Sequence, residues 1–171
     1  MNPSLFFTLS LILTSYAIIL PASGANLFDE LCKKVNDNGR CLQILKADPK
    51  LVTAKNYGEL SKYILQFALK KSIEGQNFLK GVMKTNPSSA AIKECATFDY
   101  DGVVGSFRSA LGELKEDSMT ASYDAKVSGD GPTTCDRALA AEKISNPAIS
   151  ALNKDIFLLS NLASFATDML P

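Results

Sequence analysis

The sequence has 171 residues, with 18 basic and 18 acidic side chains and no histidine. Its formal charge of zero offers no electrostatic footprint for nucleic acid or for an anionic membrane surface. Without histidine the chain lacks the commonest general base and the commonest metal ligand, so we expect no metal, no cofactor and no enzymatic activity.

The first residues are typical of a secretory signal peptide. Leu5–Leu20 is an apolar stretch without a charged side chain, and small residues follow it at 21–25. This pattern predicts a signal peptide over 1–25, with cleavage after Gly24 or Ala25. The alternative is an uncleaved membrane anchor, but the apolar stretch is shorter than a span needs and no basic cluster follows it. We therefore expect a secreted protein that has no membrane segment after cleavage.

Cleavage would leave about 146 residues, which is one ordinary domain over 26–171. Its four cysteines indicate two disulfides, because an even number of cysteines in a secreted chain is usually paired. Cys32 and Cys41 flank a strong turn signal, Asn-Asp-Asn-Gly at 36–39. We therefore predict a Cys32–Cys41 pair and, with the two cysteines that remain, a Cys95–Cys135 pair. No Cys-x-x-Cys occurs, which argues against a redox or metal-binding set.

Prolines separate the segments that have helical periodicity. We expect a helical hairpin over about 26–48, followed by four further helical regions. The first two run over about 57–84 and 88–115. The third begins at 118 and breaks at 129–132, before Cys135, and the fourth begins with Asn146 as its cap.

Each long helix carries an apolar stripe that predicts its buried face. The stripe of the first helix is Leu60, Tyr63, Ile64, Phe67, Phe78 and Val82. That of the second is Ala96, Tyr100, Val103, Phe107, Ala110 and Leu114. That of the last is Ile149, Leu152, Ile156, Leu159, Ala163 and Ala166. Signals for β-strands are almost absent, so we predict an all-α protein: an antiparallel four-helix bundle over about 56–170, preceded by an N-terminal helical hairpin and held by two disulfides.

Six aromatic residues follow the first two long helices: Tyr63, Phe67, Phe78, Phe98, Tyr100 and Phe107. We interpret them as packed core, and the alternative is the wall of a lipid-binding cavity. Paired carboxylates do not suggest catalysis. Asp99 and Asp101 are separated by about 200° around a helix, and Glu94 and Asp101 by about 10 Å along its axis.

The ordered motifs resemble the plant invertase and pectin methylesterase inhibitor family across nearly the whole mature chain, from 26 to 170. The resemblance rests on Leu-Cys-Lys-Lys at 31–34, Cys-Leu-Gln-Ile-Leu at 41–45 with Asp-Pro close behind, Cys95, and Thr-Cys-Asp-Arg-Ala-Leu at 134–139. Asn153 and Leu-Leu-Ser-Asn at 158–161 in the last helix add to it.

The resemblance implies a disulfide-bonded helical bundle, with both cysteine pairs predicted above. It also implies a secreted inhibitor that binds one-to-one to a plant enzyme and covers its active-site cleft. We favour pectin methylesterase as the partner, with cell-wall or vacuolar invertase as the alternative. A structural or ligand-binding bundle without inhibitory activity is the second alternative. The implied location is the cell wall or apoplast, and for an invertase inhibitor it can be the vacuole.

The resemblance also suggests where the enzyme is bound, namely the exposed face of the second and third long helices. On the second helix, the polar residues out of phase with the apolar stripe are Glu94, Thr97, Asp101 and Arg108. We take these four as the candidate partner-binding surface, and an ordinary solvated helix face is the alternative. Two family features are missing: a fifth cysteine in the last helix and a Pro-Lys-Phe tripeptide.

Overall fold

Helical segments follow one another through residues 24–171, the part of the chain that this computed structural model describes, with side chains from Leu27 onward. The segments are α1 (Gly24–Cys32), α2 (Asn38–Ala47), α3 (Pro49–Val52), α4 (Tyr57–Thr85), α5 (Ala90–Glu94), the π-helical turn η1 (Cys95–Asp99), α6 (Tyr100–Glu113), α7 (Ser118–Val127), α8 (Asp130–Ala141) and α9 (Pro147–Thr167). Nearly all of the predicted signal peptide, residues 1–23, lies outside the described part.

Short polar side chains fix where several of the helices begin. A free backbone N–H at a helix start needs an acceptor, and Ser, Asn and Asp supply one from the residue before the helix. This happens at α2, α4, α5, α7 and α9, where the capping residues are Asp37, Asn56, Ser89, Asp117 and Asn146. The cap predicted at Asn146 is among them.

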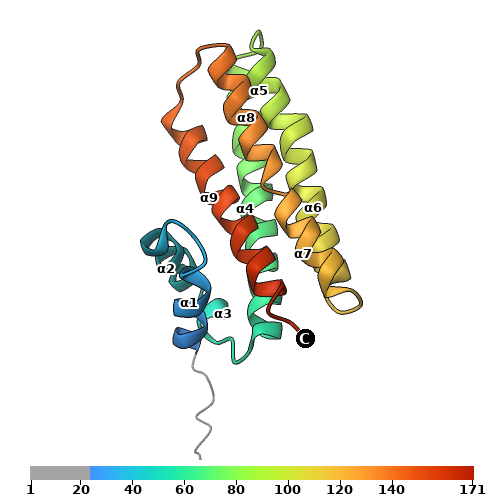
Figure 1. Cartoon of the computed structure of the whole chain (residues 1–171). Coiled ribbons are helices and arrows are strands. Elements are labelled where there is room, and N and C mark those ends of the chain that lie inside the picture. Colours follow the sequence, from blue (N-terminus) through green and yellow to red (C-terminus); the bar gives the residue numbers. More distant parts are fainter. Residues whose placement is uncertain (1–23) are drawn as a thin grey trace, which may run out of the picture.

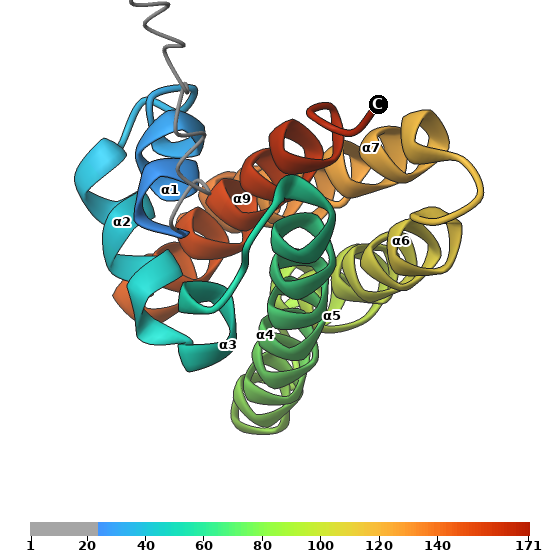
Figure 2. The same ribbon diagram turned by 90° about the horizontal axis from the view of Figure 1, so that it is seen from below.

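Four helical arms run antiparallel, as Figure 1 shows: α4, then α5–η1–α6, then α7–α8, then α9. Each arm packs against two others, because α4 contacts α6 and α9 while α7 contacts the same two helices. Figure 2 shows this arrangement from the end, with the hairpin of α1 and α2 to the side of α9. No strand occurs in the described residues, so the predicted all-α bundle with a preceding hairpin is confirmed.

The face that α4 buries is rotated from the predicted stripe. Phe78 is 41% exposed, although the stripe placed it in the core. The centre of the buried face holds small residues instead, among them Ala68, Ser72 and Gly75. A methyl group on Gly75 would lie 2.7 Å from Leu152 of α9 and 3.1 Å from Tyr100. Small side chains therefore let the three helices approach closely, and the larger aromatic residues move to the edges of the face.

Two breaks interrupt the second and third arms. The second arm widens to one π-helical turn at η1. The third arm is interrupted only at residues 128–129, so the predicted break at 129–132 was placed too late: Asp130, Gly131 and Pro132 already belong to the first turn of α8, where proline is tolerated. Gly131 has no left-handed backbone. Glycine is needed at this position because there is no room for a side chain: a methyl group would lie 2.4 Å from Val103 and 2.7 Å from the backbone oxygen of Asp99.

The N-terminal hairpin is closed by one disulfide and fastened to the bundle by two polar contacts. Cys32 and Cys41 are bonded, with their Cα atoms 5.6 Å apart, and join α1 to α2. Arg40 of α2 forms a bidentate ion pair with Asp155 of α9, and its Nε lies 2.9 Å from Oδ1. The hydroxyl of Tyr57, at the start of α4, donates to Glu30 at 2.6 Å. Partial burial, together with this hydrogen bond, raises the pKa of Tyr57 to about 12.

Candidate partner-binding surface

A groove of about 410 Å³ lies between the second and third arms of the bundle. Phe98, Asp101 and Gly102 contribute from η1 and α6, and Val127, Asp130 and Thr134 from the third arm. Phe98 is 79% exposed, an unusual fraction for a phenylalanine. We call this feature the Phe98 groove. Its position between two arms joined by a disulfide gives it rigid walls.

The Phe98 groove is acidic. Asp99, Asp101 and Asp130 are among its lining residues, and none of its lining residues is Lys or Arg. Asp101 and Asp130 are exposed, and Asp101 accepts a hydrogen bond from Gln76 of α4. An apolar aromatic side chain beside carboxylates presents a surface that is complementary to a partner with cationic and apolar groups.

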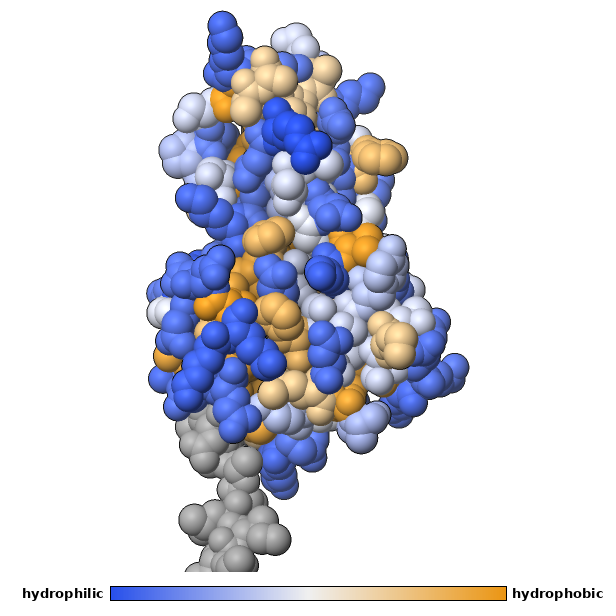
Figure 3. Space-filling model, in the orientation of Figure 1, coloured by the Kyte–Doolittle hydropathy of each residue, from blue (hydrophilic) through white to orange (hydrophobic). Residues whose placement is uncertain are grey.

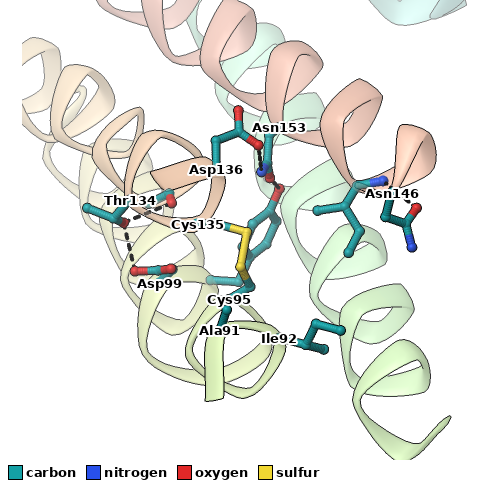
Figure 4. Close-up of a disulfide and its surroundings, with 12 residues drawn as sticks. Ala91, Ile92, Cys95, Asp99, Thr134, Cys135, Asp136, Asn146 and Asn153 are labelled. Carbon is teal, nitrogen blue, oxygen red and sulfur yellow. Dashed lines mark hydrogen bonds between the residues drawn. A yellow bond between two sulfur atoms is a disulfide. The ribbon is translucent and has the colours of Figure 1, made fainter. Parts of the chain in front are cut away.

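Asp99 is the buried member of this set, with only 4% of its surface exposed. The Thr134 hydroxyl donates to its Oδ1 at 2.7 Å, as Figure 4 shows, while its Oδ2 has no hydrogen-bond partner. Burial raises the pKa of Asp99, the Thr134 hydrogen bond opposes this, and the charge of Glu94 adds to the increase. The carboxyl group is thus held in place against the third arm.

Asp99 also lies beside the second disulfide, Cys95–Cys135, whose Cα atoms are 4.8 Å apart. Ligand atoms of these three residues lie within 4.8 Å of one another. They do not suit a metal ion, because thiolate is the form of cysteine that ligates metals and both sulfurs are committed to the disulfide. The cluster therefore serves to join η1 to α8, which form the two walls of the Phe98 groove.

A polar network that runs from the core to the surface ties the same region to α9. The Tyr100 hydroxyl donates to Asn153 Oδ1 at 2.8 Å, and Asn153 Nδ2 donates to Asp136 Oδ1 at 2.6 Å. Burial, together with the charges of Asp136 and Asp99, raises the pKa of Tyr100. Since the side chains come from α6, α9 and α8, the network fixes three helices relative to one another, and Figure 4 shows Asn153 and Asp136 close to the Cys95–Cys135 disulfide.

The four residues predicted for the partner-binding surface do not gather at one place. Only Asp101 lines the Phe98 groove. Glu94 and Arg108 are exposed elsewhere along the second arm, and Thr97 is half-buried with its hydroxyl bonded to the backbone oxygen of Lys93 at 2.7 Å. All four residues lie along the second arm, and only Asp101 contributes to the Phe98 groove.

The sequence interpretation missed Phe98, which it assigned to the packed core. A signal for its exposure was present: Phe98 is two residues from both Ala96 and Tyr100, and two residues turn a helix by about 200°. Gly102 and Gly105 were also missed. A methyl group at either would meet nothing within 4 Å, so packing within the described chain gives no reason for glycine there.

Comparison with known protein families matches residues 26–169 to the model of the plant invertase/pectin methylesterase inhibitor family. The chain belongs to this family. The match covers almost all of the predicted mature domain, so membership applies to the hairpin as well as to the bundle. The resemblance inferred from the cysteines and their surroundings is confirmed.

Solved structures of inhibitors from Arabidopsis have the same fold. One is a mutant form of a pectin methylesterase inhibitor, with a TM-score of 0.74 and 21% identity, covering 82% of this chain and 95% of the other. A second pectin methylesterase inhibitor, from Arabidopsis thaliana, has a TM-score of 0.63 and 20% identity, covering 86% and 97%. At this identity the likeness concerns the fold alone. A search of the curated proteins finds no significant match.

The two carboxylates at the junction of η1 and α6 are hydrogen-bonded within the bundle. Asp99 bonds to Thr134 and Asp101 to Gln76, so each is engaged by a neighbouring side chain within the bundle. Among the described helices none is long and apolar enough to span a membrane.

Proposed function

We propose that this protein is a secreted inhibitor that binds a plant pectin methylesterase one-to-one and covers its active-site cleft. The observation that carries the proposal is the family match over residues 26–169. The predicted signal peptide over 1–25 supports secretion to the cell wall, and the inhibitory domain would then be 26–171. The protein itself catalyses nothing in this proposal and needs no cofactor.

The Phe98 groove supports a specific mode of binding. Its walls are joined by the Cys95–Cys135 disulfide and backed by the Tyr100–Asn153 hydrogen bond, so little ordering is needed when a partner docks. Phe98 projects as an aromatic anchor, the type of residue that often dominates binding energy at an interface. The exposed glycines of α6 leave room for the partner's backbone to approach. Inhibition then follows from steric exclusion of the polysaccharide.

Invertase remains the alternative partner, because the family includes inhibitors of both enzymes. The experiment that separates the alternatives is a pair of inhibition assays with the oxidised mature protein, one on a purified plant pectin methylesterase and one on a plant cell-wall invertase. We expect loss of methylesterase activity near equimolar ratio. Loss of invertase activity alone would move the assignment to invertase, and loss of neither would leave a structural bundle without inhibitory activity.

Variants at the Phe98 groove test the binding mode. Phe98→Ala should weaken inhibition by about thirtyfold, which corresponds to about 2 kcal/mol for loss of an anchor residue. Phe157→Ala is the matched control, because Phe157 is 48% exposed and lies on α9 outside this groove. Asp101→Asn keeps an oxygen to accept from Gln76 and removes the charge, and we expect a smaller weakening that fades at high salt. Equal inhibition by all variants would contradict this mode.

A further inference from the structure

A second and larger groove lies on another face of the molecule, between the hairpin and α9. Its volume is about 660 Å³. Figure 3 shows apolar side chains gathered beside the hairpin within a border of hydrophilic ones. The hairpin contributes its turn and Arg40, and α9 contributes the opposite wall from Ala151 to Phe165. We call this feature the hairpin groove.

The interior of the hairpin groove is largely apolar. Val35, Ala151, Phe157, Leu158 and Phe165 line it. Leu158 is buried, whereas Val35 and Phe165 are half-buried and Phe157 is 48% exposed. Small-molecule sites are typically clefts of about 300–1,000 Å³ with apolar walls and a few polar groups, and they occur preferentially between substructures. The hairpin groove has this size, this lining and this position.

The charges around the hairpin groove are not balanced. Both acidic residues in its lining have partners from the chain: Asp155 pairs with Arg40, and Asp37 accepts from the backbone N–H of Arg40 at 2.9 Å. Lys34 and Lys154 also line the groove, are exposed, and form no ion pair with any residue in the described part. The lining thus carries three basic residues against two acidic ones, and the two lysines without an ion-pair partner lie beside an apolar cleft.

We propose that the hairpin groove is a binding site for a small amphipathic anion, a molecule with an apolar body and one carboxylate or sulfonate group. The apolar body lies against Leu158 and Phe165, and the anionic group is held by Lys34 and Lys154. The disulfide fixes the two arms of the hairpin to each other and the Arg40–Asp155 pair ties the hairpin to α9, so both walls of the groove are held in place without ligand. This site is separate from the Phe98 groove, so the proposal does not depend on which enzyme the protein inhibits.

The apolar lining decides against a sugar acid as the preferred ligand. An oligosaccharide carries hydroxyl groups over most of its surface, and burying them against Val35, Leu158 and Phe165 would leave them without hydrogen-bond partners. A molecule with one charged end and an apolar remainder avoids this cost. The ammonium groups of Lys34 and Lys154 would favour anions over neutral molecules of the same shape, by an amount that solvent exposure keeps modest.

The test uses a pair of fluorescent probes with similar ring systems, anionic anilinonaphthalene sulfonate and neutral phenylnaphthylamine, with the oxidised mature protein. We expect saturable one-site binding of the anionic probe and weaker binding of the neutral one. The double variant Lys34→Glu/Lys154→Glu should lower the affinity for the anionic probe by about tenfold and leave the affinity for the neutral probe unchanged. The control Lys62→Glu/Lys126→Glu makes the same charge change at exposed positions outside the groove.

A blocking variant locates the site. Ala151 is exposed on α9 and lines the groove, so Ala151→Trp should abolish binding of both probes, while Ala148→Trp, outside the groove, should not. Unchanged far-ultraviolet circular dichroism and melting temperature show that each variant is folded. Equal affinity for both probes, no effect of the double charge reversal, or full binding by Ala151→Trp would each overturn the proposal.

Discussion

Replacing Tyr100 with phenylalanine removes a single hydroxyl from the interior and tests the network that fixes α6, α8 and α9. Tyr100 is fully buried and Asn153 is 1% exposed. Without the hydroxyl, the buried Asn153 Oδ1 loses the donor that lies 2.8 Å away. Leaving such an acceptor without a partner costs about 1–3 kcal/mol. For a domain of this size, about 2 kcal/mol lowers the melting temperature by roughly 4–8 °C.

The assay is thermal and urea unfolding of the oxidised protein, followed by circular dichroism. Tyr123→Phe is the control, because Tyr123 is 67% exposed and should change stability by less than about 0.5 kcal/mol. A Tyr100→Phe/Asn153→Leu double variant replaces both partners with apolar groups, so it should be more stable than the sum of the single losses predicts. If Tyr100→Phe were as stable as Tyr123→Phe, or the two losses simply added, the network would not have the role assigned to it.

Three further predictions concern close packing, burial and the hairpin. Gly131→Ala places a methyl group against Val103 and the backbone of Asp99, so it should lower the free energy of unfolding by about 1–3 kcal/mol. Gly105→Ala, which has open space around it, should raise the free energy of unfolding by about 0.5–1 kcal/mol. Urea unfolding measures both, and equal effects would refute the packing argument. Asp99→Asn should be increasingly more stable than wild type as pH rises. Because the pKa of Asp99 is raised in the folded protein, the folded state keeps the proton at pH values where the unfolded state has lost it. The stability of the wild type therefore falls as pH rises from the ordinary Asp pKa through the folded-state pKa, whereas Asn at this position does not titrate. A stability difference between variant and wild type that shrank with rising pH would contradict the prediction. Arg40→Ala should speed amide exchange in the hairpin but not in α4, since it removes the ion pair to α9, and unchanged exchange would contradict that attachment.

Much of the fold was predictable because its signals are local. Asn146 and Pro147 mark the start of α9, and the turn signal between Cys32 and Cys41 predicts the hairpin and its disulfide. Hydrophobic periodicity on the second arm gave the buried positions from Ala96 to Ala110 correctly. Each of these features depends on residues within a few turns of one another.

The features that sequence did not predict depend on contacts between distant segments. The rotation of the α4 face follows from Gly75 meeting Leu152 and Tyr100, and the requirement for Gly131 follows from Val103. Neither is visible in the periodicity of one helix. The Phe98 groove combines η1 with the third arm, so a prediction made on one helix found Asp101 and missed Asp130.

The measurement that tests the central proposal most directly is a titration of a plant pectin methylesterase with the oxidised mature protein at mildly acidic pH, over a range of pectin concentrations. We predict that activity falls linearly to zero at a one-to-one ratio when pectin is scarce, and that more pectin relieves the inhibition, because protein and substrate compete for the same cleft. Undiminished activity at a large molar excess of folded, disulfide-bonded protein would contradict the account.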